Sequence, residues 1–250
     1  MPEERLTGGN MNAVWKSGDL VFRTAGPWTP TVHRLLRHIR QEGLLDVPEP
    51  VGVDDGGREI LKFMPGQTPI YPLPPWVWSD RLLINAGRLL RVLHETTVDF
   101  PREDTIWRMP AHEPIEVICH NDFDPYNFVC EDGELTGIID FDMASPGPRI
   151  WDLAYLAYRL CPLAGPSNPD ARNDGGPFSI EDQERRLDLL IFVYGVRFTP
   201  KQVVETAVER LLDLAEFAEQ RAFESGPAEL AEHAFLYRND AAELRSRLTD

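Results

Sequence analysis

Short stretches rich in β-branched and aromatic residues open the chain. Ala13–Lys16 and Leu20–Arg23 lie on either side of a turn that contains Gly18, and a similar run, Arg58–Met64, follows later. Apolar runs of this length around a glycine turn are typical of β-hairpins. The opening part of the chain therefore predicts a small sheet.

A single helix is expected between these strands. In Thr31–Gln41 the apolar residues recur at helical spacing, and Gly43 stands where a C-terminal cap belongs. The apolar positions are Val32, Leu35, Leu36 and Ile39.

The pattern becomes helical after the proline-rich segment Pro65–Pro75. Ser79 is a candidate N-cap, and the apolar positions that follow fall on one helical face: Leu82, Leu83, Ala86, Leu89, Leu90 and Leu93. Thr199 and Pro200 pair an N-cap with proline at the first helical position. The helical stripe behind them is Val203, Val204, Ala207, Leu211, Leu214, Ala215 and Ala218.

A hairpin interrupts this helical part. Val117–Cys119 reads as a strand, and Phe128–Cys130 and Leu135–Phe141 are joined across an Asp132-Gly133 turn, a strong local hairpin signal. We therefore predict an α+β chain. A small sheet occupies residues 1–65 and a mainly helical part with an embedded hairpin occupies residues 66–250.

Composition narrows the class of protein. The 250 residues are 42% hydrophobic, enough for one core or for two lobes. The apolar stretches are too short to cross a bilayer, and the acidic, polar N-terminus is unlike a signal peptide, so a soluble cytoplasmic protein without a membrane partner is expected. Three cysteines without Cys-x-x-Cys spacing indicate neither a disulfide framework nor a zinc ribbon.

The net charge of the chain indicates which classes of binding partner to expect. The formal charge is −16, from 41 acidic and 25 basic side chains. Such a surface repels a phosphate backbone, so nucleic acid is not an expected partner, and it attracts a cationic small molecule.

Two carboxylates close apolar strands. Asp122 and Asn127 lie in the segment His120–Asn127 directly after Val117–Cys119, and Asp140 ends the strand after the hairpin. Phosphoryl transfer needs a carboxylate to orient the attacking hydroxyl and oxygen ligands to hold magnesium. Asp122 fits the first role, and Asn127 and Asp140 fit the second.

These segments resemble the aminoglycoside phosphotransferase-like branch of the protein-kinase-like fold, which includes choline and homoserine kinases. The resemblance implies a bilobal fold that transfers the γ-phosphoryl group of ATP, with Mg²⁺, to a hydroxyl of a small molecule. It assigns the catalytic base to Asp122 and the metal to Asn127 and Asp140. The resembling segments are His120-x-Asp122-x-x-x-x-Asn127, Ile139-Asp140-Phe141, Pro146–Arg149 and Asp152–Ala154.

The opening part resembles the same family's nucleotide lobe. Glycines allow backbone N–H groups to approach phosphates closely. The resemblance assigns nucleotide contacts to a glycine loop, to the third strand and to a hinge that binds adenine. The residues concerned are Gly8, Gly9 and Asn10 in the loop, Arg23 on the strand, and Phe63 and Met64 in the hinge segment Leu61–Gly66.

Two positions depart from the family pattern. Arg23 stands where the family has a phosphate-contacting lysine, and His33 lies near the position of that lysine's helical glutamate partner. Arginine contacts phosphate bidentately and is not interchangeable with lysine. Lys16 and Lys62 are alternatives for the missing lysine. A catalytically weak or inactive kinase-fold protein that binds a nucleotide or ligand therefore stays open as a second function.

The polar cluster around the two strand ends leaves further alternatives. A metal-dependent hydrolase using His120, Asp122, Asp124, Asp140 and Asp142 is a third function. His120 is expected to support the loop by hydrogen bonding, and Asp152 to cap a helix or brace the loop. Asp124 and Asp142 are expected either near the substrate or as solvated acids.

Overall fold

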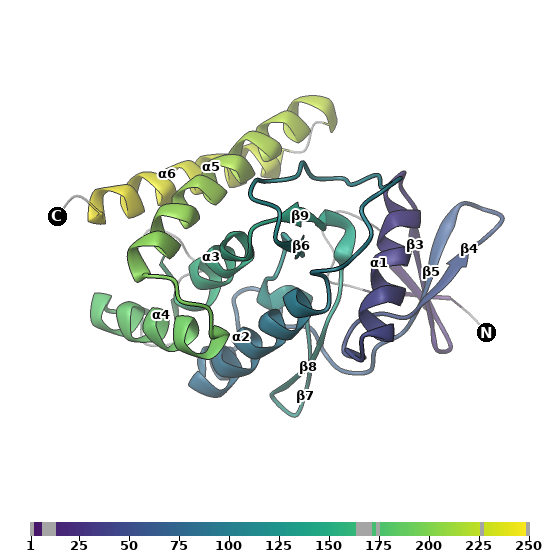
Figure 1. Cartoon of the computed structure of the whole chain (residues 1–250), viewed down its shortest axis with the longest axis horizontal. Helices are drawn as coiled ribbons and strands as arrows, with labels where there is room; N and C mark the ends of the chain where they lie inside the picture. Colours follow the sequence, from purple (N-terminus) through teal and green to yellow (C-terminus); the bar gives the residue numbers. More distant parts are fainter. Residues whose placement is uncertain (1–2, 7–13, 164–171, 174–175, 226–227, 249–250) are drawn as a thin grey trace. The chain divides into compact units, whose positions relative to one another are not determined.

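An antiparallel five-stranded sheet forms the N-terminal part of the computed structural model, which describes residues 3–6, 14–163, 172–173, 176–225 and 228–248 (Figure 1). The strand order is β1-β2-β3-β5-β4. The bounds are β1 Glu4–Leu6, β2 Val14–Ser17, β3 Leu20–Thr24, β4 Pro50–Val53 and β5 Arg58–Lys62. The predicted hairpin and returning strand are confirmed, and β1 and β4 add two strands that the sequence pattern did not reveal.

The register between β3 and β5 decides which side chains meet. Arg23 on β3 lies directly opposite Glu59 on β5, and Val21 lies opposite Leu61. Residues directly opposite each other in an antiparallel pair project from the same face of the sheet. A buried arginine and a buried glutamate therefore share one face.

Helix α1, Thr29–Gln41, contacts β4 and the short 3-10 turn η3, Phe141–Met143. Its inward side chains, including Val32, Leu35, Leu36 and Ile39, are buried as predicted. Gly43 follows the helix with φ +98°, and Leu44 N donates to Ile39 O at 3.2 Å. The predicted glycine cap is therefore confirmed.

Short strands and turns then form the region of the predicted catalytic loop. The elements are β6 Val117–Cys119, η2 Pro125–Asn127, β7 Phe128–Glu131, β8 Glu134–Ile138, η3 Phe141–Met143 and β9 Ser145–Gly147. β7 and β8 form the predicted hairpin, and β6 pairs with β9. The expected extension of β8 to Phe141 is wrong, because Asp140 adopts left-handed geometry (φ 65°), which an extended strand does not accommodate.

The remaining elements are mainly helical. They are η1 Pro75–Trp78, α2 Asp80–Glu95, α3 Arg149–Leu160, α4 Ile180–Tyr194, α5 Pro200–Ser225 and α6 Ala228–Arg247, with a small pair β10 Arg172–Asn173 and β11 Gly176–Pro177. Both predicted N-caps are confirmed: Ser79 Oγ accepts from Leu82 N, and Thr199 Oγ1 accepts from Gln202 N, each at 3.2 Å. α5 and α6 lie side by side over a small alanine-rich core.

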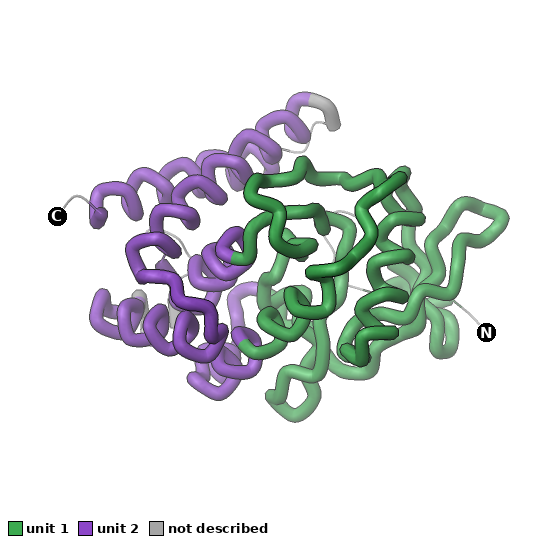
Figure 2. Tube along the Cα trace, viewed as in Figure 1, with its two compact units in different colours: residues 1–70, 88–149 green, residues 71–87, 150–250 purple. Residues whose placement is uncertain are grey.

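The chain groups into two compact units (Figure 2). One contains residues 1–70 and 88–149, and the other contains residues 71–87 and 150–250. The catalytic-loop region therefore packs in the same unit as the five-stranded sheet. The division at residue 65 stays a prediction about which segments bind nucleotide. Within the described residues, no helix combines the length and the apolar character needed to cross a membrane.

Candidate active site

The loop after β6 is held by a residue in left-handed geometry. Asn121 has φ 62°, and its buried Nδ2 donates to Met143 O at 2.8 Å and to Ser145 Oγ at 2.7 Å. Asparagine tolerates this backbone region better than most residues. Its side chain thereby anchors the start of the loop to the segment that follows η3.

Asp122 receives hydrogen bonds on both carboxylate oxygens. Tyr126 Oη donates to Oδ1 at 2.5 Å, and Asn127 Nδ2 donates to Oδ2 at 2.9 Å. The same Asn127 Nδ2 also reaches Asp122 O at 2.9 Å. The six residues from Asp122 to Asn127 therefore fold back on themselves, and the predicted base contacts one predicted metal ligand directly.

Asp140 is brought to this loop by backbone pairing. Ile139 N donates to Asn127 O at 2.9 Å, so the end of β8 lies beside η2. Repulsion from the Asp140 carboxylate also contributes to the raised pKa of Asp122. The structure therefore brings Asp122, Asn127 and Asp140 together.

His120 supports this arrangement. Its Nδ1 accepts from Asp122 N at 3.2 Å, so the ring proton lies on Nε2, which donates to Ile139 O at 3.1 Å. The ring also packs edge-on against Phe141, with 4.5 Å between ring centroids. The predicted hydrogen-bonding role of His120 is confirmed, and both ring nitrogens are engaged.

The pKa of Asp122 is raised to about 7. Burial is the largest cause, and repulsion from Asp124 and Asp140 adds to it. The hydrogen bonds from Tyr126 and Asn127 act in the opposite direction by stabilising the charged form. Carboxylates that act as general bases commonly have a pKa near neutrality.

Arg23 lies at the centre of a buried ion network. Its Nε donates to Glu59 Oε2, its Nη1 to Asp140 Oδ1 at 2.8 Å, and its Nη2 to Asp142 Oδ1 at 2.7 Å. Arg23 is only 7% exposed. Burial alone would lower its pKa, but attraction to Asp140, Asp142 and Glu59 raises it, so the guanidinium stays charged. All three nitrogens of the guanidinium therefore contact carboxylates.

Glu59 is the site residue that sequence reasoning missed. It is 1% exposed, and its Oε1 contacts His33 Nε2 at 2.8 Å. Burial favours the neutral acid, but the hydrogen bond from His33 and the charge of Arg23 outweigh it and lower the pKa of Glu59. The expected helical glutamate partner of residue 23 is therefore replaced by a strand glutamate, which His33 of α1 contacts from its other side.

The signal for Glu59 was its place in the predicted strand Arg58–Met64, which the structure pairs with the strand of Arg23. The register of that pair could not be read from the sequence, because the segment between β3 and β5 contains a helix and a further strand. Without the register, Glu59 was one acid among 41.

Asp124 and Asp142 are not solvated acids. Asp124 is fully buried, and its Oδ1 accepts from Tyr126 N at 3.2 Å. Asp142 is 4% exposed and lies against Arg23, with Arg108 Nη1 at 3.9 Å. Burial raises the pKa of Asp142 to about 6 in spite of the attraction to Arg23. Each acid has a structural partner, which corrects the alternative of a solvated side chain.

The predicted hinge, Leu61–Gly66, begins in the last residues of β5. Phe63 N donates to Asp19 O at 2.8 Å, and Met64 packs against Gly137 of the β7–β8 hairpin. Lys16 Nζ lies 3.7 Å from the centre of the Phe63 ring, a cation–π contact. Lys62, the other alternative lysine, pairs with Asp19 at 2.7 Å. Gly8, Gly9 and Asn10 lie outside the described residues.

The side chains present fit a magnesium ion. Asp140 keeps 42% of its side chain exposed although Arg23 contacts one of its oxygens. Arg23 and burial act on the pKa of Asp140 in opposite directions, and the lowered pKa keeps it ionised. Asn127 uses Nδ2 toward Asp122, which directs its amide oxygen elsewhere. Carboxylate and amide oxygens are hard ligands of the kind that Mg²⁺ prefers.

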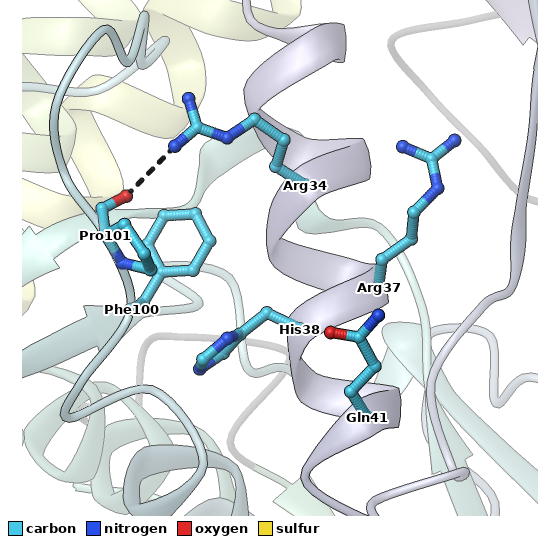
Figure 3. A pocket seen from close by; sticks show the side chains of 6 residues that line it. All are labelled: Arg34, Arg37, His38, Gln41, Phe100 and Pro101. Carbon is cyan, nitrogen blue, oxygen red and sulfur yellow. Dashed lines mark hydrogen bonds between the residues drawn. The ribbon is translucent and has the colours of Figure 1, made fainter.

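A separate shallow hollow lies between α1 and the segment after α2 (Figure 3). Arg34 Nη2 donates to Pro101 O at 3.3 Å across it, and His38 packs edge-on against Phe100. None of its lining residues is one of the predicted phosphoryl-transfer residues. The lining comprises Arg34, Arg37, His38, Gln41, Phe100 and Pro101.

Comparison with known proteins identifies the family and the fold. Residues 101–188, which include the loop after β6 and the hairpin, match the model of the phosphotransferase enzyme family. The trifolitoxin immunity protein of Rhizobium leguminosarum bv. trifolii is 39% identical over 198 residues, 76% of this chain and 73% of that protein.

Solved structures share the fold over nearly the whole chain. A choline/ethanolamine kinase family protein from Mesorhizobium loti has a TM-score of 0.67 at 21% identity, covering 98% of this chain and 88% of its own. Spectinomycin phosphotransferase APH(9)-Ia, in complex with ADP and spectinomycin, has a TM-score of 0.62 at 12% identity, covering 99% and 93%. The fold is therefore that of a kinase-like phosphotransferase. The chain belongs to the phosphotransferase enzyme family known as APH.

Proposed function

We propose that this protein transfers the γ-phosphoryl group of ATP to a hydroxyl group of a small molecule. The observation that carries the proposal is the convergence of Asp122, Asn127 and Asp140 on one side of a loop held by His120 and Asn121. Family membership and the ADP bound in a distant relative support ATP as the donor.

Each residue has a task in this reaction. Asp122 Oδ1 or Oδ2 would accept the proton of the attacking hydroxyl and hold its oxygen toward the γ-phosphorus. Asn127 and Asp140 would hold Mg²⁺, which when bound offsets negative charge on the transferring group. Phe63 and Met64 would line the base of the nucleotide, and Gly8, Gly9 and Asn10 would cover its phosphates.

Arg23 would act differently from the lysine of related enzymes. Its guanidinium is committed to Glu59, Asp140 and Asp142, so we assign it the task of fixing Asp140. Direct phosphate contact would need one of these pairs to open. Lys16, whose ammonium group lies over the face of the Phe63 ring, is the better candidate for a phosphate or base contact near the hinge.

The net charge of the chain favours one class of phosphate acceptor. A net charge of −16 favours a cationic compound, and a relative with this fold binds spectinomycin. We therefore propose hydroxylated amines as the acceptor class. A coupled assay of ADP release over a set of such compounds tests this class, with uncharged sugars of similar size as the comparison.

Substitution of Asp122 tests the mechanism. Asp122→Ala is expected to lower ATP-dependent turnover by at least about a hundredfold, the usual contribution of a general base. Circular dichroism and the thermal midpoint establish whether the fold is retained. Turnover equal to that of the native chain in a folded Asp122→Ala variant would refute the assigned base.

The alternative is a binding protein without turnover. It is favoured by Arg23, because a lysine in that position normally contacts the phosphates. Calorimetry with ATP and Mg²⁺, followed by measurement of ADP formation, separates the two functions, with Asp140→Asn as the control for the metal. Binding without ADP formation in the presence of every acceptor class would support the binding protein.

The 39% sequence identity to the trifolitoxin immunity protein favours a more specific biological role. We propose that the acceptor class includes an antibacterial toxin that loses activity when one of its hydroxyl groups is phosphorylated. Expression of the chain in a toxin-sensitive strain tests this role, with Asp122→Asn as the matched control. Protection by the native chain and by Asp122→Asn alike would argue for sequestration instead of catalysis.

The hydrolase alternative has less support. A metal ligand set would need His120, yet its Nδ1 accepts from Asp122 N and its Nε2 faces Ile139 O. Asp124 and Asp142 are similarly engaged with Tyr126 N and Arg23. Zinc or manganese content of the purified chain measures this alternative directly.

A further inference from the structure

The two oxygens of Asp122 face different neighbours. Oδ2 accepts from Asn127, a proposed metal ligand, at 2.9 Å, whereas Oδ1 accepts from Tyr126 Oη at 2.5 Å. With Mg²⁺ on Asn127, the phosphates would lie toward the Oδ2 side of Asp122, and Oδ1 would be left for the acceptor hydroxyl. The group on Oδ1 is itself a hydroxyl, supplied by the chain.

The Tyr126 hydroxyl is held firmly in this position. Tyr126 lies in the 3-10 turn η2, where Asp124 Oδ1 accepts from Tyr126 N at 3.2 Å and Asp124 O accepts from Asn127 N at 2.9 Å. Asp124 is fully buried, and Pro125 fixes the first residue of the turn. The backbone of the turn therefore fixes where the tyrosine ring begins, and the bond to Asp122 fixes where it ends.

The contact has the geometry of proton transfer. A general base must lie within about 2.6–3.2 Å of the atom whose proton it removes, and hydroxyl donors to carboxylates bond at about 2.5–2.7 Å. The 2.5 Å separation of Tyr126 Oη and Asp122 Oδ1 is that of a hydroxyl–carboxylate hydrogen bond, so Asp122 reaches the phenol proton without any movement. Tyr126 also remains half-buried, so its ring is not sealed inside the core.

We propose that Tyr126 is a phosphorylation site of the chain itself, modified at Oη when a nucleoside triphosphate is bound and no acceptor is present. This inference rests on the proposed function. The Oη–phosphorus bond forms as the bond between the γ-phosphorus and the β–γ bridging oxygen breaks. Asp122 receives the phenol proton, and the nucleoside diphosphate leaves.

The modification has a consequence for turnover. A phosphate on Tyr126 brings about −1.5 to −2 charges beside Asp122 and Asp124. These two carboxylates repel the phosphate, and the phosphate itself fills the acceptor position. An acceptor that binds first displaces the phenol from Asp122 and protects Tyr126. Self-phosphorylation thereby switches off a chain that holds nucleotide without acceptor.

Peptide mass spectrometry tests the proposal. The full chain is incubated with ATP and Mg²⁺ without acceptor, and we expect one phosphoryl group on the peptide that contains Tyr126. Because the transfer occurs within one molecule, its rate constant stays the same over a tenfold range of chain concentration. Tyr126→Phe and Asp122→Asn should each reduce the label at least tenfold, whereas Tyr237→Phe, which changes a half-buried tyrosine of α6, should retain it.

Nucleotide binding to the native chain, measured by calorimetry, separates this proposal from the proposed function. If the chain binds ATP and transfers phosphate to an acceptor while Tyr126 stays unmodified in the acceptor-free reaction, self-phosphorylation is wrong and the proposed function stands. Label on another residue alone has the same meaning. If ATP does not bind at millimolar concentration, both proposals are refuted.

Discussion

Arg23 Nε donates to Glu59 Oε2 between neighbouring strands, on the sheet face that also carries Val21 and Leu61. In the family pattern, the residue at the position of Arg23 is a lysine, and its glutamate partner comes from the helix that follows the strand. Here α1 contributes His33, which contacts the far oxygen of Glu59. The helix is therefore still connected to the strand position, but through an intervening carboxylate.

The first prediction concerns this network. Arg23→Ala removes the cation that three buried or half-buried carboxylates share, and we expect the free energy of unfolding to fall by about 3–5 kcal/mol, because uncompensated buried charge is costly. Urea unfolding measures the loss. Lys62→Ala, which removes an exposed partner of Asp19, is the matched control and should leave stability unchanged. A loss below about 1 kcal/mol in Arg23→Ala would contradict the network's structural role.

The second prediction concerns Asp122 and pH. The folded pKa of about 7 exceeds the ordinary value of 3.8, so the folded chain binds the proton more tightly than the unfolded chain. The native chain therefore loses stability as the pH rises from about 4 to 7. Asp122→Asn has no charge at this position, so we expect it to be more stable than the native chain at pH 8, by less than about 4 kcal/mol, with no such gain at pH 4.

Thermal unfolding at the two pH values measures this difference. Asp55→Asn, at an exposed turn, is the control and should follow the native chain at both. An equal effect of Asp122→Asn at pH 4 and pH 8 would show that the raised pKa contributes nothing to stability.

The third prediction concerns the start of the loop. Asn121→Ala removes bonds to Met143 O and Ser145 Oγ and places alanine in left-handed geometry. We expect a loss of about 2–4 kcal/mol in the free energy of unfolding. Asn121→Gly loses the same bonds but tolerates the backbone, so it should be more stable than Asn121→Ala by about 1 kcal/mol. Equal stabilities would mean that the side-chain bonds alone matter.

The fourth prediction concerns the end of the hinge. A Cβ on Gly66 would lie 2.7 Å from Val129 Cγ1 and 2.9 Å from Cys130 O, and φ is +130°. Gly43 also has positive φ, but a Cβ there has no neighbour within 4 Å. Gly66→Ala should therefore cost about 1–3 kcal/mol more than Gly43→Ala in urea unfolding, because only the former adds steric overlap. Equal costs would place the whole effect in the backbone geometry.

Local sequence signals predicted most of the elements around the site. The hairpin of β2 and β3, the caps Ser79, Thr199 and Gly43, and the pair β7–β8 depend on residues close together in the chain. The spacing of Asp122, Asn127 and Asp140 indicated a shared site for the same reason, since a strand, a tight turn and a returning strand leave little freedom. Strand β1 escaped prediction because it has only three residues, and β4 because two of its four residues, Pro50 and Gly52, are of types that strands disfavour.

The sequence by itself determined that a small sheet precedes a helical part and that a strand-end loop carries a carboxylate, an amide and a returning carboxylate. Only the tertiary structure decided that Glu59 partners Arg23, that Asp142 is buried and that Tyr126 reaches Asp122. The first two depend on strand register and on packing between segments far apart in the chain. The third depends on the rotamer of one side chain in a turn, which spacing alone does not specify.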